Sequence, residues 1–296
     1  METLNHCPIC NHDKHSPFLA CVDYTVSRET FKIVACDKCG FKFTNPRPAP
    51  DELGKYYQSE EYVSHSGTKK GLVNKLYHWV RNYTLGKKLQ LIYLHTQYSE
   101  PLSPTLLDIG CGTGEFLNVC KLSHIARSPA GWNVKGIEPD ARAREFATKT
   151  YGIDVGEESE LKTLPNDSYD IITLWHVLEH VPALNERIEE LKRLIKPEGK
   201  IIVAVPNCSS WDAKTYGAFW AAYDLPRHLY HFTPKDMKTL FSKHGMYITE
   251  VLPMRFDSFY VSMLSDKYKF GKTSLIRSTW NGLAQKPTWN PNAKPL

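Results

Sequence analysis

Beyond Pro104 the apolar residues of this chain alternate between short runs typical of buried strands and longer stretches with helical spacing. The short runs occupy residues 105–110, 133–138, 152–156, 169–176, 200–206 and 246–254. The helical stretches lie near residues 114–124, 140–150, 184–196 and 234–244. Strands that alternate with helices predict a parallel sheet covered on both faces. We therefore expect a doubly wound, mostly parallel α/β fold that binds ligands at the carboxyl ends of its strands.

The N-terminal third has a different pattern. Residues 1–48 are rich in cysteine, aromatic residues and turn formers, and a proline-rich stretch at 45–50 marks a boundary. From about residue 51 to 98 apolar positions recur at helical spacing, until Pro101 and Pro104 end the pattern. We expect four parts, which are a small N-terminal module at 1–48, a helical linker or cap at 49–100, an α/β domain at 101–256, and a C-terminal helix and tail at 257–296.

Composition and charge change this picture little. The 296 residues are 42% hydrophobic and 23% charged, with a formal net charge of +5. That balance suits an anionic small substrate or RNA without requiring either. No apolar run approaches the roughly 18 residues of a membrane helix, and the first residues contain no apolar secretion segment. We expect a cytoplasmic protein without a membrane partner, and the sequence carries no signal of its oligomeric state.

A glycine-rich turn joins the strand at 105–110 to the next helix, with glycines at Gly110, Gly112 and Gly114. Glycines allow a backbone to approach a ligand closely, and the first amides of the following helix can hold an anionic group. A dinucleotide-binding turn would carry a third glycine or alanine where Glu115 stands. This difference argues against NAD or FAD as the ligand.

An acidic residue follows the second strand, in the stretch GIEPD. The carboxylate of Glu138 in this stretch can accept hydrogen bonds from both hydroxyls of a ribose. Together with the glycine turn, it predicts a ligand that is a nucleoside without a pyrophosphate.

These segments resemble the class I S-adenosylmethionine-dependent methyltransferases. LLDIGCGTGEFL is similar to their first motif, GIEPD to the second, LPNDSYDIITLWHVLEHV to the segment around the fourth strand, and LKRLIKPEGKIIVAVPN to the fifth. The resemblance covers about residues 105–255 and implies a Rossmann-like methyltransferase fold with S-adenosyl-L-methionine as cofactor. It also implies the cofactor-binding residues, which are Asp108, Gly110, Gly112 and Gly114 on the methionine side and Glu138 with Pro139 at the ribose.

The end of the domain departs from this family, which usually closes its sheet with an antiparallel hairpin. We expect the run at 246–254 to be the first arm, followed by a helix at about 258–283. The proline-rich tail at 284–296 does not resemble a second arm. Three explanations stay open. The second arm is absent, the C-terminus is truncated or altered, or one of the elements predicted above is assigned to the wrong residues.

Two histidine-containing segments are candidates for catalysis. Methyl transfer is an in-line displacement, so the protein must hold the nucleophile close and often remove its proton. The fourth strand ends in His176, followed by His180, and the stretch PRHLYHF contains Arg227 and His228. We expect His228, helped by His180, to orient or deprotonate the acceptor, and Arg227 to pair with an anionic part of it. A purely structural role of either segment stays open.

The spacing from His176 to His180, H-x-x-E-H, also occurs in zinc proteases, but there it needs a helix, whereas a strand is expected here. A related set in quinone-pathway O-methyltransferases, which this segment resembles, has glutamate where His176 stands and can bind a divalent metal. A metal at this position is therefore an open alternative.

Four of the eight cysteines form two C-x-x-C pairs, Cys7 with Cys10 and Cys36 with Cys39. In a reducing compartment, pairs of this kind indicate a metal site rather than disulfides. Four thiolates complete a closed tetrahedral site, which predicts a structural Zn2+ in a zinc-ribbon-like module. The other cysteines are expected to be packing residues.

Three functions are consistent with these features. The first is an S-adenosylmethionine-dependent methyltransferase that acts on a small molecule, such as a sugar or another metabolite. The second is an rRNA methyltransferase with a zinc ribbon, although lysines and arginines form no dense basic stripe, so a nucleic-acid partner is not favoured. The third is a non-catalytic cofactor-binding protein, against which the intact glycine turn and Glu138 argue.

Overall fold

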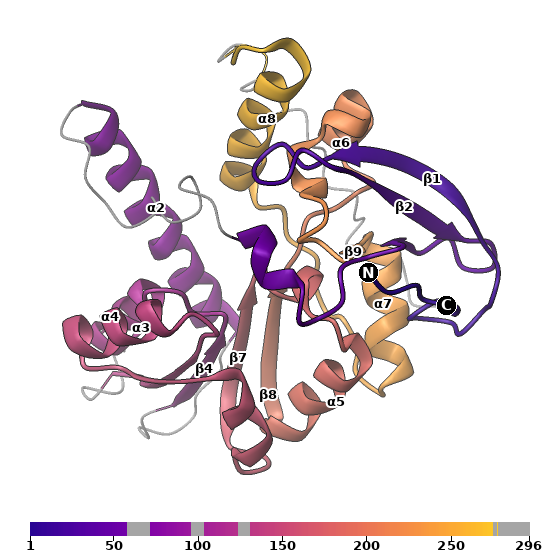
Figure 1. Ribbon diagram of the computed structural model, residues 1–296. Coiled ribbons are helices and arrows are strands. Elements are labelled where there is room, and N and C mark those ends of the chain that lie inside the picture. Colours follow the sequence, from indigo (N-terminus) through magenta and orange to yellow (C-terminus); the bar gives the residue numbers. More distant parts are fainter. Residues whose placement is uncertain (58–71, 96–103, 124–130, 275–276, 278–296) are drawn as a thin grey trace. The chain divides into compact units, whose positions relative to one another are not determined.

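The computed structural model describes residues 1–57, 72–95, 104–123, 131–274 and 277 (Figure 1). The chain divides into two compact units. The central unit contains residues 67–178 and 183–205, and the terminal unit contains residues 1–66, 179–182 and 206–296. Each unit therefore combines segments that are separated in the sequence.

The central unit contains a five-stranded sheet in which every pair of neighbouring strands is parallel. Its strands are β4 (Thr105–Ile109), β5 (Asn133–Ile137), β6 (Asp154–Gly156), β7 (Tyr169–Trp175) and β8 (Ile195–Ala204). Their order in the sheet is β6-β5-β4-β7-β8. The strand order reverses at β4, and ligands of doubly wound sheets bind at such a reversal. The predicted doubly wound α/β fold is confirmed.

The helices of this unit are α2 (Leu72–His95), α3 (Glu115–Leu122), α4 (Ala141–Tyr151) and α5 (Leu184–Leu194). Figure 1 shows α3 and α4 on one side of the sheet and α5 on the other. Because both faces are covered, the central strands β4 (TLLDI) and β7 (YDIITLW) consist mostly of apolar residues. Leu106, Ile172 and Leu174 are completely buried, as are Ile188 and Leu191 on the inner side of α5.

The terminal unit contains a four-stranded antiparallel sheet in the order β1-β2-β3-β9. Its strands are β1 (His15–Val22), β2 (Thr30–Cys36), β3 (Lys42–Thr44) and β9 (Tyr230–His231). In β3 and β9, Lys42 pairs with His231 and Phe43 with Tyr230. Backbone hydrogen bonds thus join the cysteine-rich N-terminal segment to the distant PRHLYHF stretch.

Short helices complete the terminal unit. They are η1 (Leu53–Tyr57), α6 (Trp211–Tyr216), η4 (Gly217–Phe219), η5 (Ala221–Tyr223), α7 (Pro234–Lys243) and α8 (Arg255–Phe270). The short 3-10 helix η3 (Leu178–His180) begins in the central unit and ends in this one. Helix α7 begins as predicted, because the Thr233 hydroxyl accepts the backbone N–H of Asp236 and the Asp236 carboxylate accepts the N–H of Thr233.

The predicted strand at 246–254 is wrong, since these residues form no strand. The segment lacks buried apolar side chains, and Tyr247 is 82% exposed. An alternating sequence pattern cannot form a strand without a sheet edge to pair with. The helix expected at 258–283 ends at Phe270, where Gly271 adopts a φ of 70°. Of the linker expected to be helical, η1 and α2 are described, and the remainder lies largely outside the described residues.

No helix in the described ranges has both the length and the apolarity needed to cross a membrane.

Candidate functional site

A tight turn leads from β4 into α3. Gly110 has a φ of +72°, and a Cβ atom there would lie 2.4 Å from Cγ2 of Val177, so neither the backbone nor the packing admits a larger residue. Gly112 has a φ of +55°, but a Cβ atom there would meet nothing within 4 Å. Gly114 is the N-cap of α3. The turn therefore packs against the protein at Gly110 and leaves the backbone open to a ligand at Gly112.

The carboxylate of Glu138, just after β5, lies beside this turn. It accepts the backbone N–H of Gly112 at 2.8 Å through Oε2 and that of Asp140 at 2.9 Å through Oε1. Burial raises the pKa of Glu138, while these two hydrogen bonds act in the opposite direction. Arg144 donates to the backbone oxygens of Glu138 and Pro139, at 2.7 Å each. The structure thus brings Glu138 and Gly112 together and holds the carboxylate in one orientation.

Asp108 lies near the end of β4 and is 2% exposed. Its Oδ1 accepts a hydrogen bond from the Thr173 hydroxyl at 2.6 Å. Burial raises the pKa of Asp108 to about 7, although the hydrogen bond from Thr173 lowers it. A cationic ligand group nearby would favour the ionised carboxylate.

Two histidine rings meet in the terminal unit, where the centroids of His180 and His228 are 4.5 Å apart. Nδ1 of His180 lies 2.9 Å from the Tyr57 hydroxyl and 3.1 Å from the backbone oxygen of Arg227. Nδ1 of His228 lies 2.9 Å from the backbone oxygen of Ala222. Because a carbonyl oxygen can only accept, Nδ1 of His228 carries the proton. In the neutral ring Nε2 is then the basic nitrogen.

A carboxylate lies on the basic side of His228, where Oδ2 of Asp224 is 3.9 Å from Nε2. Burial acts to raise the pKa of Asp224, but hydrogen bonds from Arg227 and the nearby His228 outweigh it, so the pKa is lowered. Asp224 is therefore ionised at neutral pH and can stabilise an imidazolium at His228.

The same cluster has the donor set of a metal site. Glu179, His180 and His228 each offer a ligand atom, and these atoms lie within 4.8 Å of one another. A carboxylate with two imidazoles suits a divalent transition metal or zinc. The metal alternative therefore involves His228 in place of His176.

The structure places Arg227 away from solvent, with 1% of its surface exposed. Its Nε and Nη2 donate hydrogen bonds to the carboxylate of Asp224, at 2.9 and 2.6 Å. Nη2 also donates to the carboxylate of Asp23 at 3.1 Å. Nη1 donates to the backbone oxygen of Tyr56 at 2.9 Å. These contacts lie inside the protein, whereas the sequence suggested a contact with the acceptor. Arg227 thus joins the N-terminal segment to the loop that carries His228.

His176 follows β7 and belongs to the central unit. It has a left-handed φ of 59°, and its backbone N–H donates to Ala204 at 3.0 Å. Non-glycine residues held in this conformation occur preferentially at functional sites. His180, His228 and Arg227 belong to the terminal unit.

The four thiols of the two C-x-x-C pairs converge. Sγ of Cys7 is 3.6 Å from Sγ of Cys39, Sγ of Cys10 is 3.5 Å from Sγ of Cys36, and all four lie within 4.8 Å of one another. A tetrahedral zinc with Zn–S bonds of about 2.3 Å requires sulfur separations of about 3.8 Å. The chain turns back at the second pair, where the N–H of Gly40 donates to Cys36 at 2.9 Å. The donor set and its spacing fit a zinc ion.

Stability should depend on pH through His180. Burial, and then the neighbouring His228, lower the pKa of His180 from 6.5 to about 4. Between these values the unfolded chain binds more protons, so the free energy of unfolding decreases as the pH falls from 6.5 to 4. We expect His180→Gln to reduce this decrease in urea unfolding experiments across that range, with His12→Gln as control. An unchanged slope would contradict a neutral, enclosed His180.

Residues 80–251, more than half of the chain, match the family model described as a methyltransferase domain. The chain belongs to this family. Its methyltransferase domain includes the glycine turn, Glu138 and both histidines of the cluster.

Several relatives carry methyltransferase names. A ubiquinone biosynthesis O-methyltransferase of Bordetella avium is 30% identical over 140 residues, which are 43% of this chain and 55% of that protein. An uncharacterized methyltransferase of Mycobacterium bovis is 32% identical over 117 residues, 38% of this chain and 43% of that protein. The chain thus spans about half the length of these relatives. A crystal structure of a SAM dependent methyltransferase from Archaeoglobus fulgidus, 23% identical, covers 56% of this chain and 68% of that chain with a TM-score of 0.43.

Sequence reasoning missed two residues that contact the histidine cluster. Tyr57, which contacts His180, follows a proline-rich boundary and belongs to no motif. Thr44, whose hydroxyl donates to the backbone oxygen of His228 at 2.7 Å, is 184 residues away in sequence. The long separation of Thr44 from His228 removes any local signal that could have revealed this contact.

Proposed function

We propose that this protein transfers a methyl group from S-adenosylmethionine to a small-molecule acceptor, with His228 as general base. The observation that carries the proposal is the pairing of the open backbone at Gly112 with the oriented carboxylate of Glu138. This arrangement suits a ligand that combines a ribose with a neutral or cationic tail. Membership of the methyltransferase family supports the same cofactor.

The residues of the central unit fit the cofactor. The cofactor supplies a methyl group activated by a positively charged sulfonium. Glu138 would accept hydrogen bonds from the ribose hydroxyls, with Pro139 beside it, and the backbone at Gly110, Gly112 and Gly114 would line the methionine part. The buried Asp108 carboxyl would ionise more readily beside a cationic group, which adds to binding.

The terminal unit offers the groups that would act on the acceptor. Nε2 of His228 is basic, and Asp224 stabilises the charge that the ring gains when it takes a proton. Because burial lowers the pKa of His180 to about 4, this neighbour stays neutral and adds no repelling charge near neutral pH. Removal of the acceptor's proton would accompany attack on the methyl carbon. Arg227 holds this loop instead of contacting the acceptor.

A small acceptor is favoured by the names of relatives, which include ubiquinone biosynthesis O-methyltransferases. The modest net charge of +5 adds little support for RNA. The rRNA methyltransferase and the non-catalytic cofactor-binding protein are the alternatives that an experiment must separate.

The test combines cofactor binding with tracing of a labelled methyl group. Calorimetry should detect binding of S-adenosylmethionine to the unchanged protein. The affinity should be at least about tenfold weaker in Glu138→Gln. It should be unchanged in the control Glu145→Gln, which removes an exposed ion pair with Lys149 within one helix. Labelled cofactor added to a fractionated extract should label small molecules. Label in RNA would favour the rRNA alternative, and binding without transfer would favour the non-catalytic one. An absence of binding to folded protein would overturn the proposal.

We also propose that Cys7, Cys10, Cys36 and Cys39 bind a structural Zn2+ that stabilises the module at residues 1–48. Removal of the metal with a strong chelator should make this module the first part of the chain to be cleaved by proteases, because a closed thiolate site contributes directly to folding. Limited proteolysis with mass spectrometry measures this, and the re-zincated protein is the control. If removal verified by metal analysis left the cleavage pattern unchanged, a structural zinc would be ruled out.

A further inference from the structure

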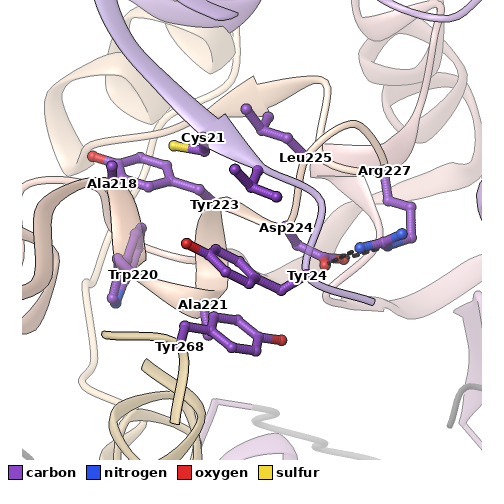
Figure 2. Close-up of a pocket in the computed structure, with 11 residues that line it drawn as sticks. Cys21, Tyr24, Ala218, Trp220, Ala221, Tyr223, Asp224, Leu225, Arg227 and Tyr268 are labelled. Atoms are coloured by element: carbon purple, nitrogen blue, oxygen red, sulfur yellow. Dashed lines mark hydrogen bonds and ion pairs between the residues drawn. The ribbon is translucent and has the colours of Figure 1, made fainter. Parts of the chain in front are cut away.

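The segment that carries His228, residues 224–231, is anchored at both ends to the N-terminal part of the chain. At its beginning, the Arg227 side chain points toward Asp224, and the two form the ion pair marked in Figure 2. Arg227 also pairs with Asp23, in the loop after β1. At the other end of the segment, β9 pairs with β3. The placement of His228 therefore depends on residues that come early in the chain.

Thr44, the last residue of β3, contacts His228 directly. It is completely buried. Its hydroxyl donates to the backbone oxygen of His228 at 2.7 Å, and the hydroxyl oxygen lies 3.1 Å from Nε2 of His231. Because a hydroxyl has one proton and a carbonyl oxygen can only accept, the Thr44 oxygen accepts from the Nε2–H of His231. Burial lowers the pKa of His231 well below 6.5, so this ring is neutral and has one N–H to donate.

The hydroxyl of Thr44 holds one side of the peptide group that joins His228 to Leu229. The N–H on the other side of this peptide group donates to the backbone oxygen of Glu179 at 2.8 Å. The backbone N–H of Thr44 also donates to the oxygen of Leu229 at 3.0 Å. The direction of a side chain depends on the backbone angles of its own residue, so these contacts constrain where the imidazole of His228 points.

We propose that Thr44 is a positioning residue for His228, so that the N-terminal segment forms part of the methyl-transfer site. This inference rests on the proposed role of His228 as general base. Without the hydroxyl, the buried oxygen of His228 and the N–H of His231 both lose a partner, which is costly, and the peptide group is expected to turn toward other partners. The imidazole then moves as well, and a displacement of about 1 Å can lower a rate about a hundredfold.

The test compares Thr44→Val, which keeps the shape but lacks the hydroxyl, with Thr44→Ser, which keeps the hydroxyl. Transfer of labelled methyl from S-adenosylmethionine to the small-molecule fraction of cell extract should fall at least about tenfold per folded molecule in Thr44→Val. It should stay within about threefold in Thr44→Ser, and the cofactor affinity should not change in either variant. Thr239→Val, which removes an exposed hydroxyl on α7, is the matched control. Equal turnover of Thr44→Val and Thr44→Ser would overturn the proposal.

Nuclear magnetic resonance of protein isotope-labelled in its histidines gives a second measurement, which needs no acceptor. The ring signal of His228, identified by its loss in His228→Gln, should shift or split in Thr44→Val and return in Thr44→Ser, while the signal of His244 stays unchanged. An unmoved His228 signal in folded Thr44→Val would refute the positioning role. If Thr44→Val does not fold, Thr44→Cys, whose thiol is a weak donor, takes its place in both measurements.

The same experiments separate this inference from the proposed function. Full turnover of His228→Gln would overturn the general-base role and the positioning role with it. An inactive His228→Gln beside a fully active Thr44→Val would overturn the positioning role alone.

Discussion

Turnover should fall by about two to four orders of magnitude when His228 is replaced by glutamine, the range expected for loss of a general base. The amide of glutamine cannot take a proton. The affinity for S-adenosylmethionine should stay within about twofold, because the cofactor-binding residues belong to the central unit. Steady-state kinetics and calorimetry measure the two quantities separately.

The control for this variant is His244→Gln, which changes a buried histidine at the C-terminal end of α7. It should leave turnover per folded molecule near that of the unchanged protein. Normal turnover of a folded His228→Gln protein would exclude His228 as the base and leave a structural role for its loop.

Replacing Arg227 by methionine is expected to lower the free energy of unfolding by about 3–5 kcal/mol, the usual cost of removing one partner of a buried ion pair. The change leaves Asp23, completely buried, and Asp224, 24% exposed, without their guanidinium. It also removes the hydrogen bond to the backbone oxygen of Tyr56. Urea unfolding at neutral pH measures the loss.

Arg142→Met is the matched control, since the ion pair between Arg142 and Asp140 is largely exposed. Its loss should change the free energy of unfolding by no more than about 1 kcal/mol. If Arg227→Met proved as mild as this control, the buried cluster would not hold the terminal unit together.

The parallel sheet could be predicted because each of its strands is encoded locally. A strand buried on both faces must be largely apolar, so β4 and β7 stand out against the helices between the strands. The segment at 246–254 shows the limit of this reasoning. Its β-branched and aromatic residues predict a strand. A strand forms only where the edge of a sheet is available for pairing, and the sequence of the segment does not contain that information.

Part of the candidate site could be predicted from the sequence. Glycine spacing pointed to the turn at Gly110, but the reason that glycine is required there, the side chain of Val177, lies 67 residues away. The cysteine spacing predicted a four-thiol cluster because two intervening residues suffice to bring a pair of sulfurs together. The sequence predicted that Arg227 pairs with the acceptor, and an arginine in a polar loop gives no sign that Asp23 will be buried against it.

By itself, the sequence determined the doubly wound sheet, the glycine turn with Glu138 and the two cysteine pairs, because each depends on residues close together in the chain. Only the tertiary structure decided that β9 pairs with β3, that His180 and His228 touch, and that Arg227 joins Asp23 to Asp224. These contacts span up to 204 residues. They form because charges and backbone groups that become buried as the chain folds need hydrogen-bonding partners. Those partners can be far away in the sequence, so no local pattern of residues predicts them.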